Sequence, residues 1–194
     1  AVQARTPATK EFTTKYQCLF GALLHATKFR PEISAAMGLL GACLTFPNEA
    51  LYEHLMHVLV YLGRTRKMGL TYSANAVDAT TLRAYADSNW GVTRSTTGFC
   101  IMLAGAAITS VSRRQHCITM SSCEAELVAL ADCAIELIHI LGVVEFIGFE
   151  HDGPIEACSD SKSAVDLCHR FTSAQNSRPV CCSKASVISV RSRS

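Results

Sequence analysis

The sequence lacks a strong charge of either sign. Of its 194 residues, 49% are hydrophobic and only 18% are charged, and the formal net charge is +2. A nearly neutral chain has no general attraction for polyanions, so composition alone gives no reason to expect nucleic acid as a partner. The same composition argues against wholesale disorder, and the length allows a sizeable core.

The spacing of a zinc site is also missing, although ten cysteines are present. No C-x-x-C occurs, and only Cys181 and Cys182 stand close together. Most of the others lie in apolar or mixed runs. We interpret them as reduced, buried thiols of an intracellular protein, in the cytoplasm or the nucleus. A cysteine-based metal or redox protein is the weaker alternative.

Long hydrophobic runs are absent as well. No apolar run reaches the ~18 residues that suggest a membrane span, so we expect no membrane partner. The first fifteen residues have no hydrophobic stretch of the kind found in signal peptides. They also lack methionine, so we expect a fragment of a longer chain.

The first half of the chain has the pattern of helices. Proline disfavours helix in the residue before it, so Arg30-Pro31 divides one helix over about 15–29 from another over 32–45. Asn48 can cap a third helix, whose leucines recur at helical spacing, and a short strand is expected in "MGLTYS". We therefore expect a flexible segment over 1–14 and a helical segment over 15–74.

The second half has a different order of elements. It is predicted to run strand, strand, strand, helix, strand, helix over residues 80–171, which is an α/β order. The first two β-strands after "TLRAYADSNW" form a hairpin that turns near Ala104-Gly105, and residues 122–147 form one long helix. Residues 172–194 are rich in serine and arginine and poorly patterned, so we expect a loose tail there.

Two glutamates near the start of the long helix have different explanations. Ser121 and Glu124 match the S-x-x-E capping box, in which Glu124 bonds back to the Ser121 backbone N–H. Glu126 lies about 200° around the helix from Glu124, at ~100° per residue, among apolar neighbours. A carboxylate in that position is costly unless it is paired or bound to a metal.

Two aspartates follow predicted strands. Asp87 in "YADSNWG" can simply start a turn, and Asp160 in "CSDSKSA" can cap the next helix. Ligands of α/β sheets usually bind at such strand ends, however. Glu126 lies on the helix that must pack on the same sheet. Asp87, Glu126 and Asp160 can therefore converge, and oxygen-only ligands favour Mg²⁺ or Mn²⁺.

Several ordered motifs resemble the C-terminal part of copia-type LTR retrotransposon Pol polyproteins. They cover roughly residues 15–170 and are "YQCLFGALLHATKFRPEISAAMGLL", "HVLVYLGRTRKMGLTY", "AYADSNWG", "RSTTGFCIMLAGAAITSVSRRQ", "SSCEAELVALADCAIE" and "CSDSKSAVDLC". By this resemblance the chain comprises the end of the reverse transcriptase region, with its helical connection segment, and the ribonuclease H domain.

The resemblance implies a fold, an activity and a set of site residues. The fold would be RNase H-like, an α/β fold with a mixed sheet of about five strands flanked by helices. The activity would be divalent-metal-dependent cleavage of the RNA strand of RNA–DNA hybrids. The family's catalytic acids fall on Asp87, Glu126 and Asp160. The implied partners are the hybrid and the reverse transcriptase polymerase domain of the same polyprotein.

The chain departs from the family after Asn176-Ser177-Arg178. The family continues with a strand and a helix that carry a fourth acid, whereas no Asp or Glu follows Asp166 here. We therefore expect the C-terminal strand and helix to be missing. The alternative function is a catalytically inactive relic that keeps the fold and acts only as a structural or nucleic-acid-binding module.

Substrate contacts are expected from small polar side chains and one cation near the acids. A hybrid is distinguished by its groove shape and its 2′-hydroxyl groups rather than by sequence. Ser88, Asn89 and Ser161 suit hydroxyl groups, and Arg94 suits a phosphate. Each of them could equally be an ordinary solvated residue.

Overall fold

The computed structural model describes residues 8–75, 80–91, 93–148, 155–175 and 188–192. The chain divides into two compact units, residues 1–70 and 71–194. The predicted domain limits, 15–74 and 80–171, stay predictions.

The first unit is helical. It contains α1 (Lys10–Ala26), the short 3-10 helix η1 (Pro31–Ile33), α2 (Ser34–Gly41) and α3 (Glu49–Arg64). Its core is formed by Tyr16, Phe20, Leu23, Ile33, Met37, Leu40 and Leu55. As predicted, Asn48 caps α3, because its Oδ1 accepts a hydrogen bond from the Leu51 N–H at 2.9 Å.

Two local predictions in this region are wrong. Helix α1 begins at Lys10, within the expected flexible segment, because the Thr9 side chain caps it by accepting from the Phe12 N–H. The stretch 68–73 contains no strand. Instead, Tyr72 and Ser73 donate single hydrogen bonds to the carbonyl oxygens of Ala107 and Ala104, at 2.7 and 3.0 Å.

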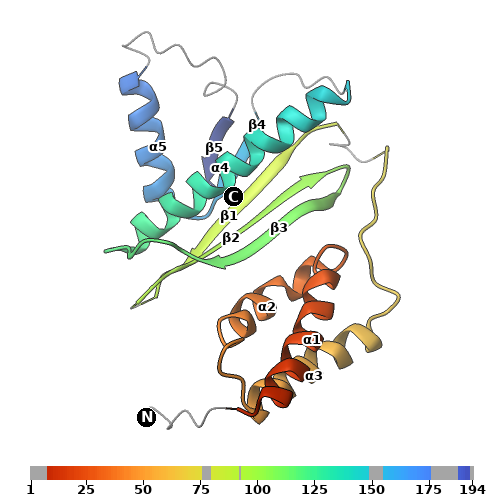
Figure 1. The fold of residues 1–194 in the computed structure, drawn as a ribbon. Helices are drawn as coiled ribbons and strands as arrows, with labels where there is room; N and C mark the ends of the chain where they lie inside the picture. Colours follow the sequence, from red (N-terminus) through yellow and green to blue (C-terminus); the bar gives the residue numbers. More distant parts are fainter. Residues whose placement is uncertain (1–7, 76–79, 92, 149–154, 176–187, 193–194) are drawn as a thin grey trace. The chain divides into compact units, whose positions relative to one another are not determined.

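The second unit is built on a five-stranded sheet with the strand order β3-β2-β1-β4-β5 (Figure 1). The strands are β1 (Arg83–Asn89), β2 (Thr96–Leu103), β3 (Ala106–Arg114), β4 (Ile155–Ser159) and β5 (Ile188–Ser192). The pairs β1–β2 and β2–β3 are antiparallel, whereas β4 is parallel to both β1 and β5. This mixed sheet, flanked by helices, is the RNase H-like arrangement, so the predicted fold class is confirmed.

The hairpin between β2 and β3 turns where the sequence predicts. Ala104 and Gly105 both have positive φ, 54° and 85°. A two-residue turn with positive φ at both positions has the twist that suits a β-hairpin. Glycine adopts this conformation freely, but alanine does so only with strain.

Two helices pack on the sheet and close its core. Helix α4 (Ser122–Phe146) buries one stripe of its surface against β1 and β2, and α5 (Lys162–Gln175) contacts β5 and α4. The core includes Leu82, Ala84, Phe99, Ile101, Leu130, Cys133, Leu137, Leu141 and Ile155. The N-terminal end of α4 is therefore fixed against the end of β1.

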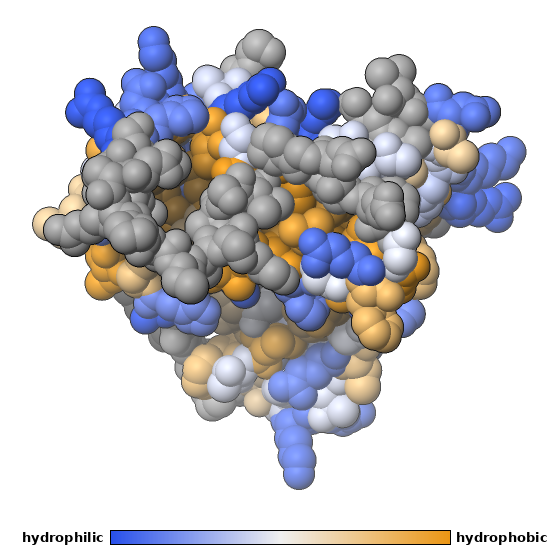
Figure 2. Space-filling view, turned by 90° about the horizontal axis from the view of Figure 1, so that it is seen from above, coloured by the Kyte–Doolittle hydropathy of each residue, from blue (hydrophilic) through white to orange (hydrophobic). Residues whose placement is uncertain are grey.

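Helix α4 is also long and apolar enough, by length and composition, to cross a membrane. Some of its apolar side chains are exposed, including Ile135, Val143 and Phe146. Hydrophobic residues gather near the centre of the face seen in Figure 2, and hydrophilic residues lie around its rim. The buried stripe on the sheet accounts for α4 as a core helix, and the absence of a membrane partner stays a prediction.

The expected loose tail contains a strand. Helix α5 extends to Gln175, and β5 pairs with β4 from Ile155↔Ile188 to Ser159↔Ser192. The prediction that the C-terminal strand is missing is therefore wrong. Ile188 and Val190 alternate with polar residues over only four positions, the surrounding sequence is rich in serine and arginine, and the pairing partner of this strand lies about 30 residues earlier. The rest of 176–187, and 193–194, lie outside the described residues.

Candidate metal centre

The strand register brings two of the predicted acids to the same edge of the sheet. Strands β1 and β4 are parallel and pair from Arg83↔Glu156 to Tyr85↔Cys158. Continuing this register by two residues places Asp87 beside Asp160. Asp87 lies near the end of β1 and Asp160 directly follows β4, so both carboxylates leave the sheet where the strands end.

Helix α4 supplies the third acid. Glu126 belongs to the buried stripe that continues through Leu130, Cys133 and Leu137, and only 7% of its surface is exposed. The stripe faces the sheet, so the Glu126 carboxylate is directed toward the end of β1. Glu126 is thus an acid at the N-terminal end of a stripe of α4 that is otherwise apolar.

Glu126 is held by hydrogen bonds from two serines. The backbone N–H and the hydroxyl of Ser88 donate to Glu126 Oε1 at 3.1 and 2.7 Å. The hydroxyl of Ser159 donates to Oε2 at 3.5 Å, and it also accepts from the Ser161 N–H at 3.2 Å. Both oxygens of the carboxylate are therefore oriented by residues at the ends of β1 and β4.

Glu124 has the separate, structural role that the capping box predicts. Ser121 caps α4, because its hydroxyl accepts from the Glu124 N–H at 3.1 Å. The Glu124 carboxylate reaches the Met120 N–H at 2.6 Å, one residue before the Ser121 N–H that we expected.

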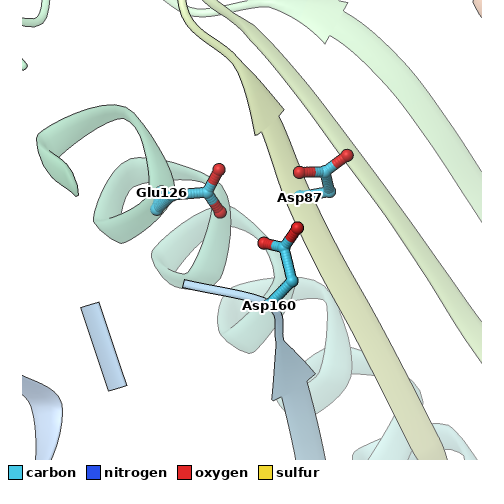
Figure 3. Close-up of side chains that lie close together, drawn as sticks. All are labelled: Asp87, Glu126 and Asp160. Atoms are coloured by element: carbon cyan, nitrogen blue, oxygen red, sulfur yellow. The ribbon is translucent and has the colours of Figure 1, made fainter. Parts of the chain in front are cut away.

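The three acids meet at one point (Figure 3). One carboxylate oxygen from each of Asp87, Glu126 and Asp160 lies within 4.8 Å of the other two. Glu126 is buried, whereas Asp87 and Asp160 are exposed. The cluster is therefore anchored on the side of α4 and open on the side of the strand ends.

The surroundings of Glu126 raise its pKa in the absence of a cation. Burial is the largest cause that raises the pKa of Glu126 above its usual value. The hydrogen bonds from Ser88 act in the opposite direction, and the negative charges of Asp87 and Asp160 raise the pKa further. A divalent cation would reverse this balance, because it is attracted to all three carboxylates.

The donor set fits a hard divalent cation. Two oxygens that bind the same Mg²⁺ would lie at most about 4.1 Å apart, because a Mg–O bond is about 2.05 Å long. Oxygens within 4.8 Å of one another need only a small side-chain movement to share such an ion. All three ligands are carboxylates, the type that Mg²⁺ and Mn²⁺ prefer. The roles of these residues as ligands and as catalytic groups stay predictions.

The four predicted substrate contacts differ in their surroundings. The Ser88 hydroxyl is engaged by Glu126, so it holds a carboxylate in place, a role that sequence reasoning missed. Ser161 accepts from the Ala164 N–H at 3.4 Å at the start of α5, which is a capping contact. Asn89 and Arg94 are exposed. Contacts of any of the four with substrate remain predictions.

Sequence reasoning also missed a buried polar group next to Glu126. Gln115 is 1% exposed, and its Nε2 donates to the Ala125 carbonyl oxygen at 2.9 Å and to Thr97 Oγ1 at 3.1 Å. These bonds tie the first turn of α4 to β2. The signal was a glutamine directly after β3, but its direction depends on how β3 and α4 pack, which the sequence does not show.

Comparisons with known proteins give several relatives, among them Pol polyproteins of transposons. No protein-family model matches the chain. The chain is 28% identical over 159 residues to the "Retrovirus-related Pol polyprotein from transposon RE1" of Arabidopsis thaliana, covering 80% of the chain and 11% of that protein. It is 28% identical over 157 residues to the corresponding polyprotein from transposon TNT 1-94 of Nicotiana tabacum, covering 78% of the chain and 12% of that protein.

A third relative is an uncharacterised mitochondrial protein of Arabidopsis thaliana. It is 36% identical over 126 residues, which cover 63% of the chain and 52% of that protein. The chain thus spans about a tenth of the length of the two Pol polyproteins, 11% and 12%, and about half of the mitochondrial protein.

Solved structures with a similar arrangement are more distant. LC11-RNase H1 in complex with an RNA/DNA hybrid is 15% identical with a TM-score of 0.39, covering 58% of this chain and 85% of that one. A foamy viral protease-reverse transcriptase in complex with double-stranded DNA is 14% identical with a TM-score of 0.44, covering 96% of this chain and 35% of that one. The fold assignment above depends on the strand order and not on these scores. Homologues of this chain include retrovirus-related Pol polyproteins of copia-type transposons, of which it matches a C-terminal segment.

Proposed function

We propose that the chain carries a retrotransposon RNase H domain, which cleaves the RNA strand of RNA–DNA hybrids with the help of Mg²⁺ or Mn²⁺. One observation carries the proposal: Asp87, Glu126 and Asp160 present oxygens within 4.8 Å of one another at the strand ends of an RNase H-like sheet. Such a cluster suits phosphodiester cleavage, in which negative charge accumulates on oxygen atoms.

The three acids would divide the work according to their exposure. Asp87 and Asp160 are exposed, so they can share cations with the phosphate of a bound strand. Glu126 is buried and held by Ser88, so it fixes the position of the site relative to the fold. A bound Mg²⁺ would lower the pKa of a water molecule and neutralise charge on the phosphate.

One feature of the chain favours the alternative, a relic without catalysis. No Asp or Glu follows Asp166, so residues 167–194 supply no fourth carboxylate. With three acids the site can hold a cation, but a second cation would be held more weakly. The relic would keep the sheet, including β5, and would act only as a structural or nucleic-acid-binding module.

A cleavage assay separates the two functions. The substrate is an RNA–DNA hybrid labelled on the RNA strand, incubated with the full chain in Mg²⁺, in Mn²⁺ and in EDTA. Asp87→Asn and Glu126→Gln each remove one carboxylate of the cluster. Glu124→Gln is the matched control, because it removes an acid two residues from Glu126 that only caps α4.

If the chain is an enzyme, it should cleave the hybrid in a metal-dependent reaction. Asp87→Asn and Glu126→Gln should each reduce the cleavage rate by about 100-fold or more, as loss of a charge-stabilising catalytic group does. Glu124→Gln should cleave nearly as fast as the unmodified chain. If the chain is a relic without catalysis, neither the unmodified chain nor any variant should cleave the hybrid above the EDTA background. Cleavage that both Asp87→Asn and Glu126→Gln retain would contradict the assignment of the site.

The proposed partners and location follow from the same reading. The partners are the hybrid and the reverse transcriptase polymerase domain of the same polyprotein, because the chain matches only a segment of Pol polyproteins. An intracellular location, in the cytoplasm or the nucleus, is supported by the described cysteines. Free thiols among them are Cys18, Cys43, Cys100, Cys117, Cys123 and Cys133.

A further inference from the structure

The only tryptophan of the chain, Trp90, is fixed in place and yet exposed. It follows the last residue of β1, and 52% of its surface is accessible to solvent. Its indole Nε1–H donates a hydrogen bond to the Thr119 carbonyl oxygen at 3.3 Å. A tryptophan that served only to fill the core would be largely buried, whereas about half of the surface of Trp90 is left for another contact.

A buried polar network lies beneath the bond that holds Trp90. The hydroxyls of Ser95 and Thr119 share a hydrogen bond of 2.8 Å, and both residues are buried. The Gly91 N–H donates to Ser95 Oγ at 3.4 Å, and the Gln115 N–H donates to the Ser95 carbonyl oxygen at 2.9 Å. These bonds connect the turn after Trp90 to the loop before α4.

Gly91, the residue that follows Trp90, is closely packed. A Cβ atom on Gly91 would lie 2.6 Å from the Arg94 carbonyl oxygen, so only glycine fits there without a backbone shift. The position of Trp90 is therefore determined by close packing on one side and by the indole hydrogen bond on the other. Because the Trp90 side chain is already fixed, stacking of a ligand on its ring would cost little side-chain entropy.

Two further apolar residues lie next to Thr119 in the sequence, the residue whose carbonyl oxygen accepts the Trp90 hydrogen bond. Ile118 is 67% exposed and Met120 is 86% exposed, on either side of Thr119. We call Trp90, Ile118 and Met120 the apolar shelf. It joins the end of β1 to the loop that leads into α4, and those are the elements that supply Asp87 and Glu126.

The shelf lies close to the carboxylate cluster. Trp90 is three residues from Asp87, so their Cα atoms are at most about 11 Å apart. At 3.4 Å per base pair this distance corresponds to about three base pairs of a duplex. A nucleic acid with a phosphate at the cluster would therefore have sugars and bases within reach of Trp90.

We propose that the apolar shelf is a nucleic-acid subsite, in which Trp90 contacts the sugar and base faces of a bound RNA–DNA hybrid within about three base pairs of the carboxylate cluster. The inference rests on the proposed function, since the hybrid is the ligand that the cluster would act on. Aromatic faces bind bases and sugars with little regard to sequence, and cleavage of hybrids requires no sequence preference.

Because Trp90 is the only tryptophan, its fluorescence reports on the subsite directly. The full chain is titrated with an unlabelled RNA–DNA hybrid in Ca²⁺, which supports binding with little turnover, while Trp90 emission is recorded. A parallel titration of a fluorescein-labelled hybrid measures binding independently through its anisotropy. Trp90→Phe and Trp90→Ala test the side chain, and Phe146→Ala removes an aromatic ring that is 90% exposed at the far end of α4.

If Trp90 is part of the subsite, the hybrid should quench Trp90 emission. The quenching should saturate at the same hybrid concentrations as the anisotropy of the labelled hybrid. Trp90→Ala should bind the hybrid about 5- to 100-fold more weakly, as loss of one aromatic stacking contact does. Trp90→Phe should stay within about threefold of the unmodified chain, because a smaller aromatic face remains. Phe146→Ala should bind like the unmodified chain. Quenching does not depend on a variant, so it remains decisive if Trp90→Ala folds poorly.

The outcomes separate this inference from the proposed function. If the hybrid binds by anisotropy and is cleaved in Mg²⁺, but Trp90 emission does not change and Trp90→Ala binds the hybrid as tightly as the unmodified chain, the subsite is wrong and the function stands. An effect of Phe146→Ala equal to that of Trp90→Ala would also overturn the subsite. If the chain does not bind the hybrid at all, both the function and the subsite fail.

Discussion

At the scale of single residues, environment distinguishes two glutamates that are only two positions apart. Glu124 is exposed and caps α4, whereas Glu126 is buried and faces Asp87 and Asp160. The sequence predicts this difference, because the capping box accounts for one acid and leaves the other without a partner. It does not predict that Ser88 and Ser159 orient Glu126, because those contacts depend on how α4 packs on the sheet.

Glu126 should make the metal-free protein less stable as the pH rises. Its folded pKa is raised, so between its unfolded pKa, about 4.3, and its folded pKa the native state binds more protons than the unfolded state. The free energy of unfolding therefore falls as the pH increases through that window, and the loss is complete above the folded pKa.

Glu126→Gln removes this titration. In EDTA at pH 7 the variant should be more stable by roughly 1 kcal/mol, the size of a typical substitution effect. Its stability should also change less with pH between 4 and 7 than that of the unmodified chain. Urea unfolding at several pH values measures both effects. A variant that is less stable at pH 7 in EDTA would contradict the electrostatic description of the site.

Ser88→Ala tests the residue that holds Glu126. The variant loses the 2.7 Å hydroxyl bond but keeps the backbone bond. Since hydrogen bonds to charged groups contribute about 1.5–3 kcal/mol, Mn²⁺ affinity should fall by about tenfold or more. Calorimetric titration checks the prediction, with Ser163→Ala on α5 as the control. Equal Mn²⁺ affinities would show that the hydroxyl has no part in the site.

At the scale of elements, local signals predict most helices and the hairpin, and they fail where distant contacts decide. Asn48 and Ser121 mark helix starts in the sequence because their caps are local. The stretch 68–73 has a strand-like composition, but its Tyr72 and Ser73 each make a single bond to the hairpin and form no ladder. The strand β5 was missed because its pairing partner is distant in the sequence.

The hairpin turn carries a strain that one substitution should relieve. Ala104 has a φ of 54°, which asparagine tolerates better than alanine, and Asn-Gly is a preferred pair for this turn. Ala104→Asn should raise the free energy of unfolding by about 0.5–1 kcal/mol. Ala104→Val, which places a β-branched residue at positive φ, should lower it. Urea unfolding followed by Trp90 emission measures both, and the reverse order would contradict the turn geometry.

The strand β5 should contribute to the stability of the sheet. Val190 packs against the core on β5, whereas Ser192 on the same strand is exposed. Val190→Asp should lower the free energy of unfolding by about 2–4 kcal/mol, because it brings an unpaired charge to the core. Ser192→Asp should change it by less than about 0.5 kcal/mol. Equal effects of the two changes would show that β5 is not part of the folded sheet.

At the scale of the whole molecule, the strand order places the site. Because β1 lies between β2 and β4, and β4 is parallel to it, the ends of β1 and β4 come together beside the first turns of α4. The sequence predicts the α/β order and the three acids at strand and helix ends. The register that puts Asp87 beside Asp160, and the buried network of Gln115 and Ser95, follow only from the packed structure.

The most direct test of the account is a calorimetric titration of Mn²⁺ into the unmodified chain, Glu126→Gln and Glu124→Gln at neutral pH. The account predicts that the unmodified chain and Glu124→Gln bind Mn²⁺ with the same affinity. Glu126→Gln should bind at least about tenfold more weakly, because a carboxylate ligand has been removed. Equal binding by Glu126→Gln and Glu124→Gln, or no binding by the unmodified chain, would contradict the metal centre.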